Sequence, residues 1–259
     1  MTEPLRTRLA SGKPQFGCWL SLASPFSAEA LSQSGFDFLV VDMEHSPADT
    51  MDTIGLLQAI GNGIAAPIVR VTENRTALVK RAMDAGAPNV LFPSVNDAAE
   101  ARQAANAMRY PQVLEGRSND GQRGVAGVVR AARYGLEPEY LARANATACT
   151  IVQIETAAGL ANADAIAAID GVDALFVGPA DLAARLGHLD RPDHPDVQRA
   201  IARVLQIARG RGKAAGIFAL TAEAARTAAA QGFTLIAVGA DIAWLMRGAR
   251  EALAAVRAS

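Results

Sequence analysis

Acidic, amide, basic and imidazole side chains occur in four short motifs, each at the end of a run of apolar residues. The motifs are Asp42-Met43-Glu44-His45, Arg70, Gln153-Ile154-Glu155 and Gly178-Pro179-Ala180-Asp181. Together these residue types could bind a divalent cation, hold a carboxylate or oxyanion, and move a proton. If the apolar runs are parallel barrel strands, their carboxyl ends meet at one edge and bring the motifs into one site.

Glu155 and Asp181 are the candidate metal ligands. Hard cations such as Mg²⁺ or Mn²⁺ prefer oxygen ligands, and two carboxylates leave coordination positions for water and substrate. The structural alternative is that Asp181 caps the following helix and that Glu155 pairs with an arginine. A glutamate directly after the apolar run 151–154 would be costly to bury unpaired, so the sequence favours a metal.

His45 and Arg70 are the candidates for proton transfer and anion binding. Histidine titrates near neutral pH, which suits proton transfer, and His45 is one of three histidines. The other two, His188 and His194, lie in a stretch rich in Asp and Pro that is typical of a surface loop. The planar guanidinium of Arg70 could hold a carboxylate or an oxyanion. A structural role stays open for both residues, as an ion pair in the case of Arg70.

Lysine is scarce, and its positions argue against Schiff-base chemistry. The chain has Lys13, Lys80 and Lys213, and none follows an apolar run at a predicted strand end. A Schiff base requires a desolvated amine inside the pocket. Carbanion chemistry in this chain would therefore rely on a metal as electron sink.

The elements that must position these side chains follow a repeating pattern. Eight short apolar runs are each followed by a longer, alanine-rich amphipathic segment, and their length and branched content are typical of strands buried on both faces. The runs are Phe16–Leu22, Phe38–Asp42, Pro67–Val71, Asn89–Pro93, Thr150–Glu155, Ala174–Gly178, Ala214–Phe218 and Leu235–Gly239. Eight such units predict a (β/α)8 TIM barrel, an α/β fold with a parallel eight-stranded barrel. A doubly wound open sheet is the competing layout.

Two of the intervening segments carry clear helix signals. Pro195–Gly210 has a proline in the first turn, an apolar stripe and a terminal glycine. Asn74 is predicted to cap a second helix, which stops at Gly86. We expect one domain spanning residues 1–259, interrupted by a long segment without strand signals after Tyr110. A lid is expected at about 111–127, because long loops in compact domains are usually functional or mobile.

Composition excludes several classes of function. The formal net charge is −1, with acids and bases interleaved, so a nucleic-acid partner or an anionic membrane surface is not expected. No apolar run approaches the ~20 residues of a membrane helix, and the first residues lack the apolar stretch of a signal peptide. We expect a cytoplasmic protein with two buried, reduced thiols, Cys18 and Cys149. Neither a dinucleotide-binding glycine motif nor a P-loop is present.

Taken in order, the motifs resemble the HpcH/HpaI aldolase family. The resemblance runs from about Phe16 to Val256 and is carried by Gly35-Phe36-Asp37-Phe38, Asp42-Met43-Glu44-His45, Pro67-Ile68-Val69-Arg70, Arg109-Tyr110-Pro111, Arg123-Gly124, Val152-Gln153-Ile154-Glu155-Thr156 and Val177-Gly178-Pro179-Ala180-Asp181-Leu182. The resemblance implies a class II pyruvate aldolase that reversibly cleaves a 4-hydroxy-2-oxo acid to pyruvate and an aldehyde. The segments 186–189 and 194–198 look most like the branch that acts on 2-dehydro-3-deoxyglucarate.

The resemblance also implies roles for individual residues. Glu155 and Asp181 would bind Mg²⁺, Mn²⁺ or Co²⁺, and pyruvate would chelate that ion, its carboxylate held by the backbone amides of Ala180 and Asp181. Arg70 would contact the keto or enolate oxygen, and Gln153 would support the metal shell. The residues expected to contact substrate are Trp19, Asp42, Gln153, Gly178, Pro179, Ala180, Asp181 and Phe218.

His45, paired with Asp84, would serve in proton transfer according to the same resemblance. Asp84 carries no signal of its own and looks like an ordinary helix-end residue. The last helix, 241–256, could dock on its own barrel, whereas the resemblance implies its exchange between subunits of a hexamer. The loop 112–122 is several residues longer than in the family, and 218–221 departs from the smaller aliphatic residues expected there. Both departures fall on the part of the site that would hold the aldehyde.

Two other functions stay open. A citrate-lyase-like acyl-CoA lyase would use the same barrel and metal pair, although no basic cluster for a nucleotide tail is evident. A non-catalytic, metabolite-binding barrel is the third hypothesis. Retention of the metal pair together with His45 and Arg70 argues against it.

Overall fold

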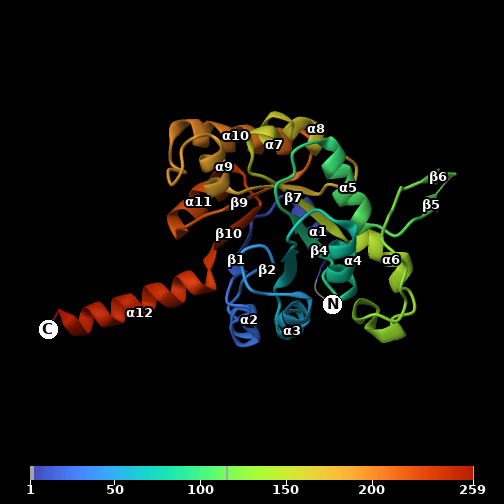
Figure 1. The fold of residues 1–259 in the computed structure, drawn as a ribbon, viewed down its shortest axis with the longest axis horizontal. Coiled ribbons are helices and arrows are strands. Elements are labelled where there is room, and N and C mark those ends of the chain that lie inside the picture. Colours follow the sequence, from blue (N-terminus) through green and yellow to red (C-terminus); the bar gives the residue numbers. More distant parts are fainter. Residues whose placement is uncertain (1–2, 115, 259) are drawn as a thin grey trace.

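Eight parallel strands form a closed barrel in the computed structural model, which describes residues 3–114 and 116–258 (Figure 1). Around the barrel the strand order is β1-β2-β3-β4-β7-β8-β9-β10, and β1 pairs with both β2 and β10. The strands are β1 Gln15–Leu20, β2 Phe38–Asp42, β3 Ala66–Arg70, β4 Asn89–Phe92, β7 Cys149–Ile154, β8 Ala174–Val177, β9 Ala214–Phe218 and β10 Leu235–Ala240. The predicted (β/α)8 barrel is confirmed, and the open sheet is excluded because the first and last strands pair.

Strand bounds agree with the sequence-based ranges to within two residues. β2 and β9 match at both ends, whereas β7 stops at Ile154 and β8 at Val177. Glu155 and Gly178 are therefore the first residues beyond their strands, on the loops that lead to the next helices.

Helices cover the outside of the barrel, and further short helices occur at the amino terminus and in the connections (Figure 1). They are α1 Leu5–Ala10, α2 Pro25–Ser32, α3 Thr50–Ile60, α4 Thr76–Asp84, α5 Ala98–Met108, α6 Tyr140–Thr147, α7 Ala157–Ala161, α8 Ala163–Ala167, α9 Pro179–Arg185, α10 Pro195–Gly210, α11 Ala222–Gln231 and α12 Asp241–Arg257, with a 3₁₀ segment, η1, at Arg130–Gly135. α10 has the predicted bounds and buries the predicted stripe, including Val197, Ile201 and Val204. The Asn74 cap is wrong: α4 begins at Thr76, and the Asn74 amide donates to the Glu100 carbonyl at 2.8 Å instead.

The core has an inner and an outer layer because successive strand residues face opposite sides of the sheet. Phe38, Val40 and Ile68 point into the barrel, and Leu39 and Val41 pack under the surrounding helices. Cys18 and Cys149 are both buried and unpaired, as expected.

The long segment after Tyr110 forms a hairpin and a short helical region. β5 (Val113–Leu114) pairs antiparallel with β6 (Arg117–Ser118), and the hairpin points away from the barrel (Figure 1). η1 and α6 follow and lead into β7.

α12 leaves the barrel instead of docking along it (Figure 1). Its first residue, Asp241, is buried, and its carboxylate accepts hydrogen bonds from the backbone of Ser21 at 2.8 Å and of Leu22 at 3.3 Å. Trp244 stacks on Phe36 with ring centroids 5.7 Å apart. The rest of the helix projects from the barrel, so docking along the chain's own barrel is not observed. None of the helices in the described part of the chain is both long and apolar enough to cross a bilayer.

Candidate active site at the carboxyl ends of the barrel strands

A cavity of about 710 Å³ opens where the barrel strands end. Ten of the residues predicted for the site line it: Trp19, Asp42, His45, Arg70, Gln153, Gly178, Pro179, Ala180, Asp181 and Phe218. Glu155 lies directly behind this lining, because a Cβ added to Gly178 would be 2.6 Å from Glu155 Oε2. Asp84 is not part of the cavity wall.

Arg70 is held by two carboxylates at the carboxyl end of β2. The register of β2 and β3 places Asp42 beside Arg70, and Arg70 donates through Nε to Asp42 Oδ1 at 2.9 Å and through Nη2 to Oδ2 at 2.7 Å. Its Nη1 lies 2.9 Å from Glu44 Oε2. The structural ion pair that the sequence left open is therefore present. Since a guanidinium has five N–H donors, Arg70 keeps donors for a ligand in the cavity that it lines.

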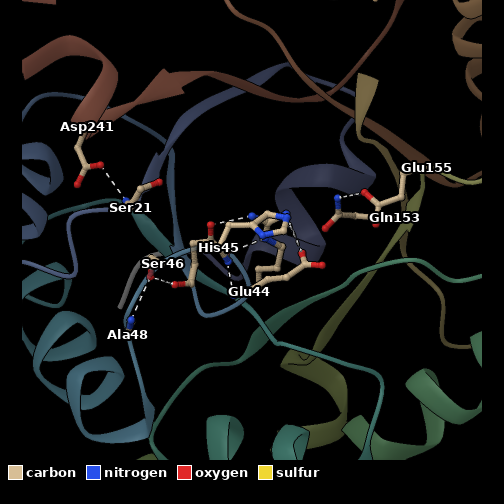
Figure 2. Close-up of polar contacts among 10 residues, drawn as sticks. Ser21, Glu44, His45, Ser46, Ala48, Gln153, Glu155 and Asp241 are labelled. Atoms are coloured by element: carbon tan, nitrogen blue, oxygen red, sulfur yellow. Dashed lines mark hydrogen bonds and ion pairs between the residues drawn. The ribbon is translucent and has the colours of Figure 1, made fainter. Parts of the chain in front are cut away.

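Glu155 is buried without an arginine partner. Its Oε1 accepts from the Ser94 backbone N–H at 2.7 Å and from Ser94 Oγ at 3.0 Å. Its Oε2 accepts from Gln153 Nε2 at 2.6 Å, the contact that Figure 2 shows. Burial raises the pKa of Glu155, and the negative charges of Asp181 and Glu44 raise it further, against the hydrogen bonds from Ser94. Neutral donors thus orient a carboxylate whose charge is not compensated.

Ser94 could not be found from the sequence. It follows β4 by two positions and has a left-handed backbone with φ of 50°, a conformation that is uncommon outside glycine. Only the fold shows that this backbone points its N–H at Glu155. Its one possible signal is its place two residues after an apolar run.

The acidic groups around Glu155 fit a divalent cation. Burial also raises the pKa of Glu44. The negative charges of Asp42 and Asp181 raise this pKa further, and the positive charge of Arg70 opposes the increase. The side-chain oxygen of Gln153, Oε1, is buried without a hydrogen-bond partner among the described residues. Carboxylate and amide oxygens are the ligands that Mg²⁺ and Mn²⁺ prefer, so Glu155 and Asp181, supported by Gln153, could hold such an ion.

His45 and Asp84 do not meet within this chain. His45 is exposed over 64% of its side chain, and its Nε2 lies 4.0 Å from Glu44 Oε2; Figure 2 shows the two side chains together. Asp84, at the end of α4, accepts instead from Arg123 Nη2 at 2.8 Å. Arg123 also bonds to the Tyr140 hydroxyl at 2.9 Å. The pairing of His45 with Asp84 is therefore not found in the described residues.

Comparison with known proteins identifies the family of the chain. The family model described as HpcH/HpaI aldolase/citrate lyase matches residues 15–247. The chain belongs to this family. It is similar to a hydroxypyruvate/pyruvate aldolase of Paraburkholderia phytofirmans, with 49% identity over 99% of this chain and 98% of the relative. It is also similar to a 5-keto-4-deoxy-D-glucarate aldolase of an Enterobacter species, with 43% identity over 96% and 94% of the two chains.

Solved structures give the same picture. An HpcH/HpaI aldolase/citrate lyase family protein from Burkholderia cenocepacia superimposes with a TM-score of 0.94, at 48% identity over 98% of both chains. The family assignment and the names of the relatives make this protein an aldolase, and so a carbon–carbon lyase.

A second cluster of side chains, formed by His188, His194 and Asp196, lies at the start of α10. His188 and His194 lie in the largely exposed loop between α9 and α10, as expected; their side chains are partly buried, and their ring centroids are 3.5 Å apart. His194 Nδ1 accepts from the Asp196 backbone N–H at 3.2 Å and caps α10, while His188 Nε2 lies 3.0 Å from Asp196 Oδ2. These three side chains come close enough to share an ion, but the contacts account for them as a helix cap.

The lysines and the insertion stay away from the cavity. None of the three lysines lines it, and Lys213 donates to the Val172 carbonyl at 2.7 Å, next to the start of β9. Among the described residues of 111–127, none contributes to its wall. The lid function of this segment stays a prediction.

Proposed function

We propose that this aldolase reversibly cleaves a 4-hydroxy-2-oxo acid to pyruvate and an aldehyde by a metal-dependent, class II mechanism. The observation that carries the proposal is the buried, uncompensated carboxylate of Glu155, close enough to Asp181 for that acid to raise its pKa. A divalent cation would compensate both acids, and among the basic groups of the cavity wall Arg70 is already paired with Asp42 and Glu44. The relatives named pyruvate aldolase and keto-deoxy acid aldolase support the same substrate class.

Glu155 and Asp181 would hold the divalent ion, with Mg²⁺, Mn²⁺ or Co²⁺ as candidates. When bound, the ion would withdraw electron density from the 2-keto group and so stabilise the negative charge of the enolate. The backbone N–H groups of Ala180 and Asp181, in the first turn of α9, are available for the pyruvate carboxylate, because the α9 cap makes no side-chain hydrogen bond to them.

Arg70 would stabilise the charge that develops on the enolate oxygen. Its ion pairs with Asp42 and Glu44 fix the guanidinium at the cavity wall, so that its remaining donors are oriented before the bond breaks. His45, which lines the same cavity, would take the proton from the C4 hydroxyl. The C3–C4 electron pair then passes to the pyruvate fragment as an enolate, the aldehyde leaves, and a proton adds to C3.

Chelation tests this proposal. Purified enzyme treated with EDTA and dialysed should release no pyruvate from a 4-hydroxy-2-oxo acid, and Mn²⁺ or Mg²⁺ should restore the release. The variant Glu155→Gln should keep its fold but lose metal affinity, because an amide removes one anionic ligand. Turnover that is indifferent to EDTA would refute the mechanism.

We also propose that the active protein is an oligomer that covers α12, with a hexamer as the expected assembly. In the single chain Leu245, Met246 and Leu253 are 58%, 44% and 49% exposed on a helix that extends from the barrel. Exposed apolar surface of this kind marks an interaction site. Light-scattering mass should give an oligomer, and deletion of residues 246–259 should lower that mass; a wild-type monomer would refute the assembly. Cytoplasmic location stays a prediction.

A further inference from the structure

The cavity extends well beyond the part that the proposed pyruvate site needs. From Arg70 and Asp181 it continues between α10 and α11, where its wall includes Ile201, Leu220 and Thr227. Trp19, also in the wall, packs against two aromatic rings, with its ring centroid 5.5 Å from that of Phe176 and 5.2 Å from that of Phe218. The part between α10 and α11 offers room for the carbon chain of an acceptor aldehyde, and we call it the acceptor subsite.

The acceptor subsite holds negative charge and offers no cation. Asp193 and Glu223 line it, and neither has a hydrogen-bond or ion-pair partner among the described residues. Arg70 is the one arginine in the described cavity wall, and its charge already faces Asp42 and Glu44. His45, the other basic group in the wall, faces Glu44. A carboxylate on the acceptor would meet like charge without a partner.

Helix amino termini, which can also hold anions, do not change this balance. α10, α11 and α12 each carry an acid in the first turn, namely Asp196, Glu223 and Asp241. The side chain of Thr221 caps α11 and accepts from the Ala224 N–H at 3.1 Å. Because side chains of the chain itself cap α10 and α11, the capped N–H groups at these helix starts are not free for an acceptor carboxylate.

We infer that the acceptor subsite selects an uncharged aldehyde and that Glu223 is a specificity-determining residue against aldehydes that carry a carboxylate. This inference rests on the proposed pyruvate aldolase function. Asp193 and Glu223 are exposed, so they would repel an acceptor carboxylate by a modest amount and offer it no bond, whereas an uncharged chain can pack on Trp19 and Phe218.

A size-matched pair of acceptors tests the inference. Butanal and succinic semialdehyde share a four-carbon chain and a similar aldehyde group, and differ in a terminal carboxylate. With pyruvate and Mn²⁺, kcat/KM for butanal should exceed that for succinic semialdehyde by at least about tenfold. Equal or better use of succinic semialdehyde would overturn the inference.

The variant Glu223→Arg tests whether Glu223 causes the preference for butanal over succinic semialdehyde. It should reduce the butanal preference by about threefold or more, since an exposed charge contributes modestly. Glu139→Arg makes the same charge change at an exposed residue that does not line the cavity, and it should leave the preference unchanged. An equal change in both variants would show a general charge effect and would overturn the role of Glu223.

Deuterium exchange at C3 of pyruvate separates this inference from the proposed function. The exchange needs pyruvate and metal but no acceptor, and NMR measures it in D₂O. Exchange without the expected preference would overturn the inference and leave the aldolase function standing. Absence of both exchange and aldol product with Mg²⁺, Mn²⁺ and Co²⁺ would overturn both.

Discussion

Replacement of Gly178 by alanine should damage the metal site while leaving the fold intact. Gly178 has φ of −94° and ψ of 94°, a conformation open to any residue, so the backbone does not require glycine. The added methyl group would lie 2.6 Å from Glu155 Oε2 and 3.4 Å from Gln153 Nε2. To restore an ordinary contact of 3.4 Å, the carboxylate oxygen must move by about 0.8 Å.

Such a shift is large for a metal ligand. We expect Mn²⁺ affinity to fall by about 10- to 100-fold and kcat/KM by about 100-fold, because misplacement of ~1 Å in a reacting group has that effect. Calorimetric Mn²⁺ titration and pyruvate release measure the two losses, and thermal unfolding in EDTA checks the fold.

Gly210→Ala is the matched control for Gly178→Ala. Gly210 ends α10, and an added Cβ would meet nothing within 4 Å. This variant should bind Mn²⁺ and turn over like wild type. Wild-type metal affinity in Gly178→Ala would refute the placement of Glu155 behind this residue.

Three further variants probe the same site. His45→Ala should keep Mn²⁺ binding and lose about 10²- to 10⁴-fold in kcat; near-normal turnover with intact binding would remove His45 as the base. Arg70→Lys should lower the free energy of unfolding by about 2 kcal/mol, because buried Asp42 loses a bidentate partner; urea unfolding without a change would contradict that. Burial raises the pKa of Glu155 above its ordinary 4.5, so the folded metal-free protein binds this proton more tightly than the unfolded chain and loses stability as pH rises above 4.5. In EDTA, the Tm of Glu155→Gln minus that of wild type should therefore increase from pH 4.5 toward neutrality. A Tm difference that does not depend on pH would argue against a raised pKa of Glu155.

The barrel could be predicted because its pattern repeats. Strands buried on both faces give apolar runs such as 38–42 and 235–239, and the eightfold recurrence leaves few other layouts. Helix starts were harder, because capping depends on where a side chain finds its partner. Asn74 has the right residue type for a cap, but the approach of α5 offers it the Glu100 carbonyl. The direction of α12 could not be predicted from its pattern alone, since an amphipathic helix has the same pattern whether it packs on its own chain or on a partner; only the resemblance implied exchange between subunits.

The two acids proposed as the metal pair could be selected from the sequence because each closely follows an apolar run. The support of Glu155 could not, because Ser94 acts through a backbone N–H in a left-handed conformation, and any residue type supplies an N–H. The resemblance paired His45 with Asp84, but in this chain Asp84 belongs to the Arg123 group. Arg123 also lies 4.3 Å from the centroid of the Tyr110 ring.

The strand-end part of the cavity can be predicted from the sequence and the acceptor subsite cannot, for a physical reason. Residues that follow the carboxyl ends of barrel strands lie at the mouth of the barrel, so their place in the site follows from their position in the sequence. The acceptor subsite is built from the sides of α10 and α11, where Thr227 and Glu223 occupy positions that any solvent-facing helix residue could fill. Solvent exposure alone would favour a charged residue at position 223, and only its place in the cavity wall gives that charge a consequence for the substrate. Substrate preference in this fold should therefore change through helix-face substitutions that leave the strand-end motifs untouched.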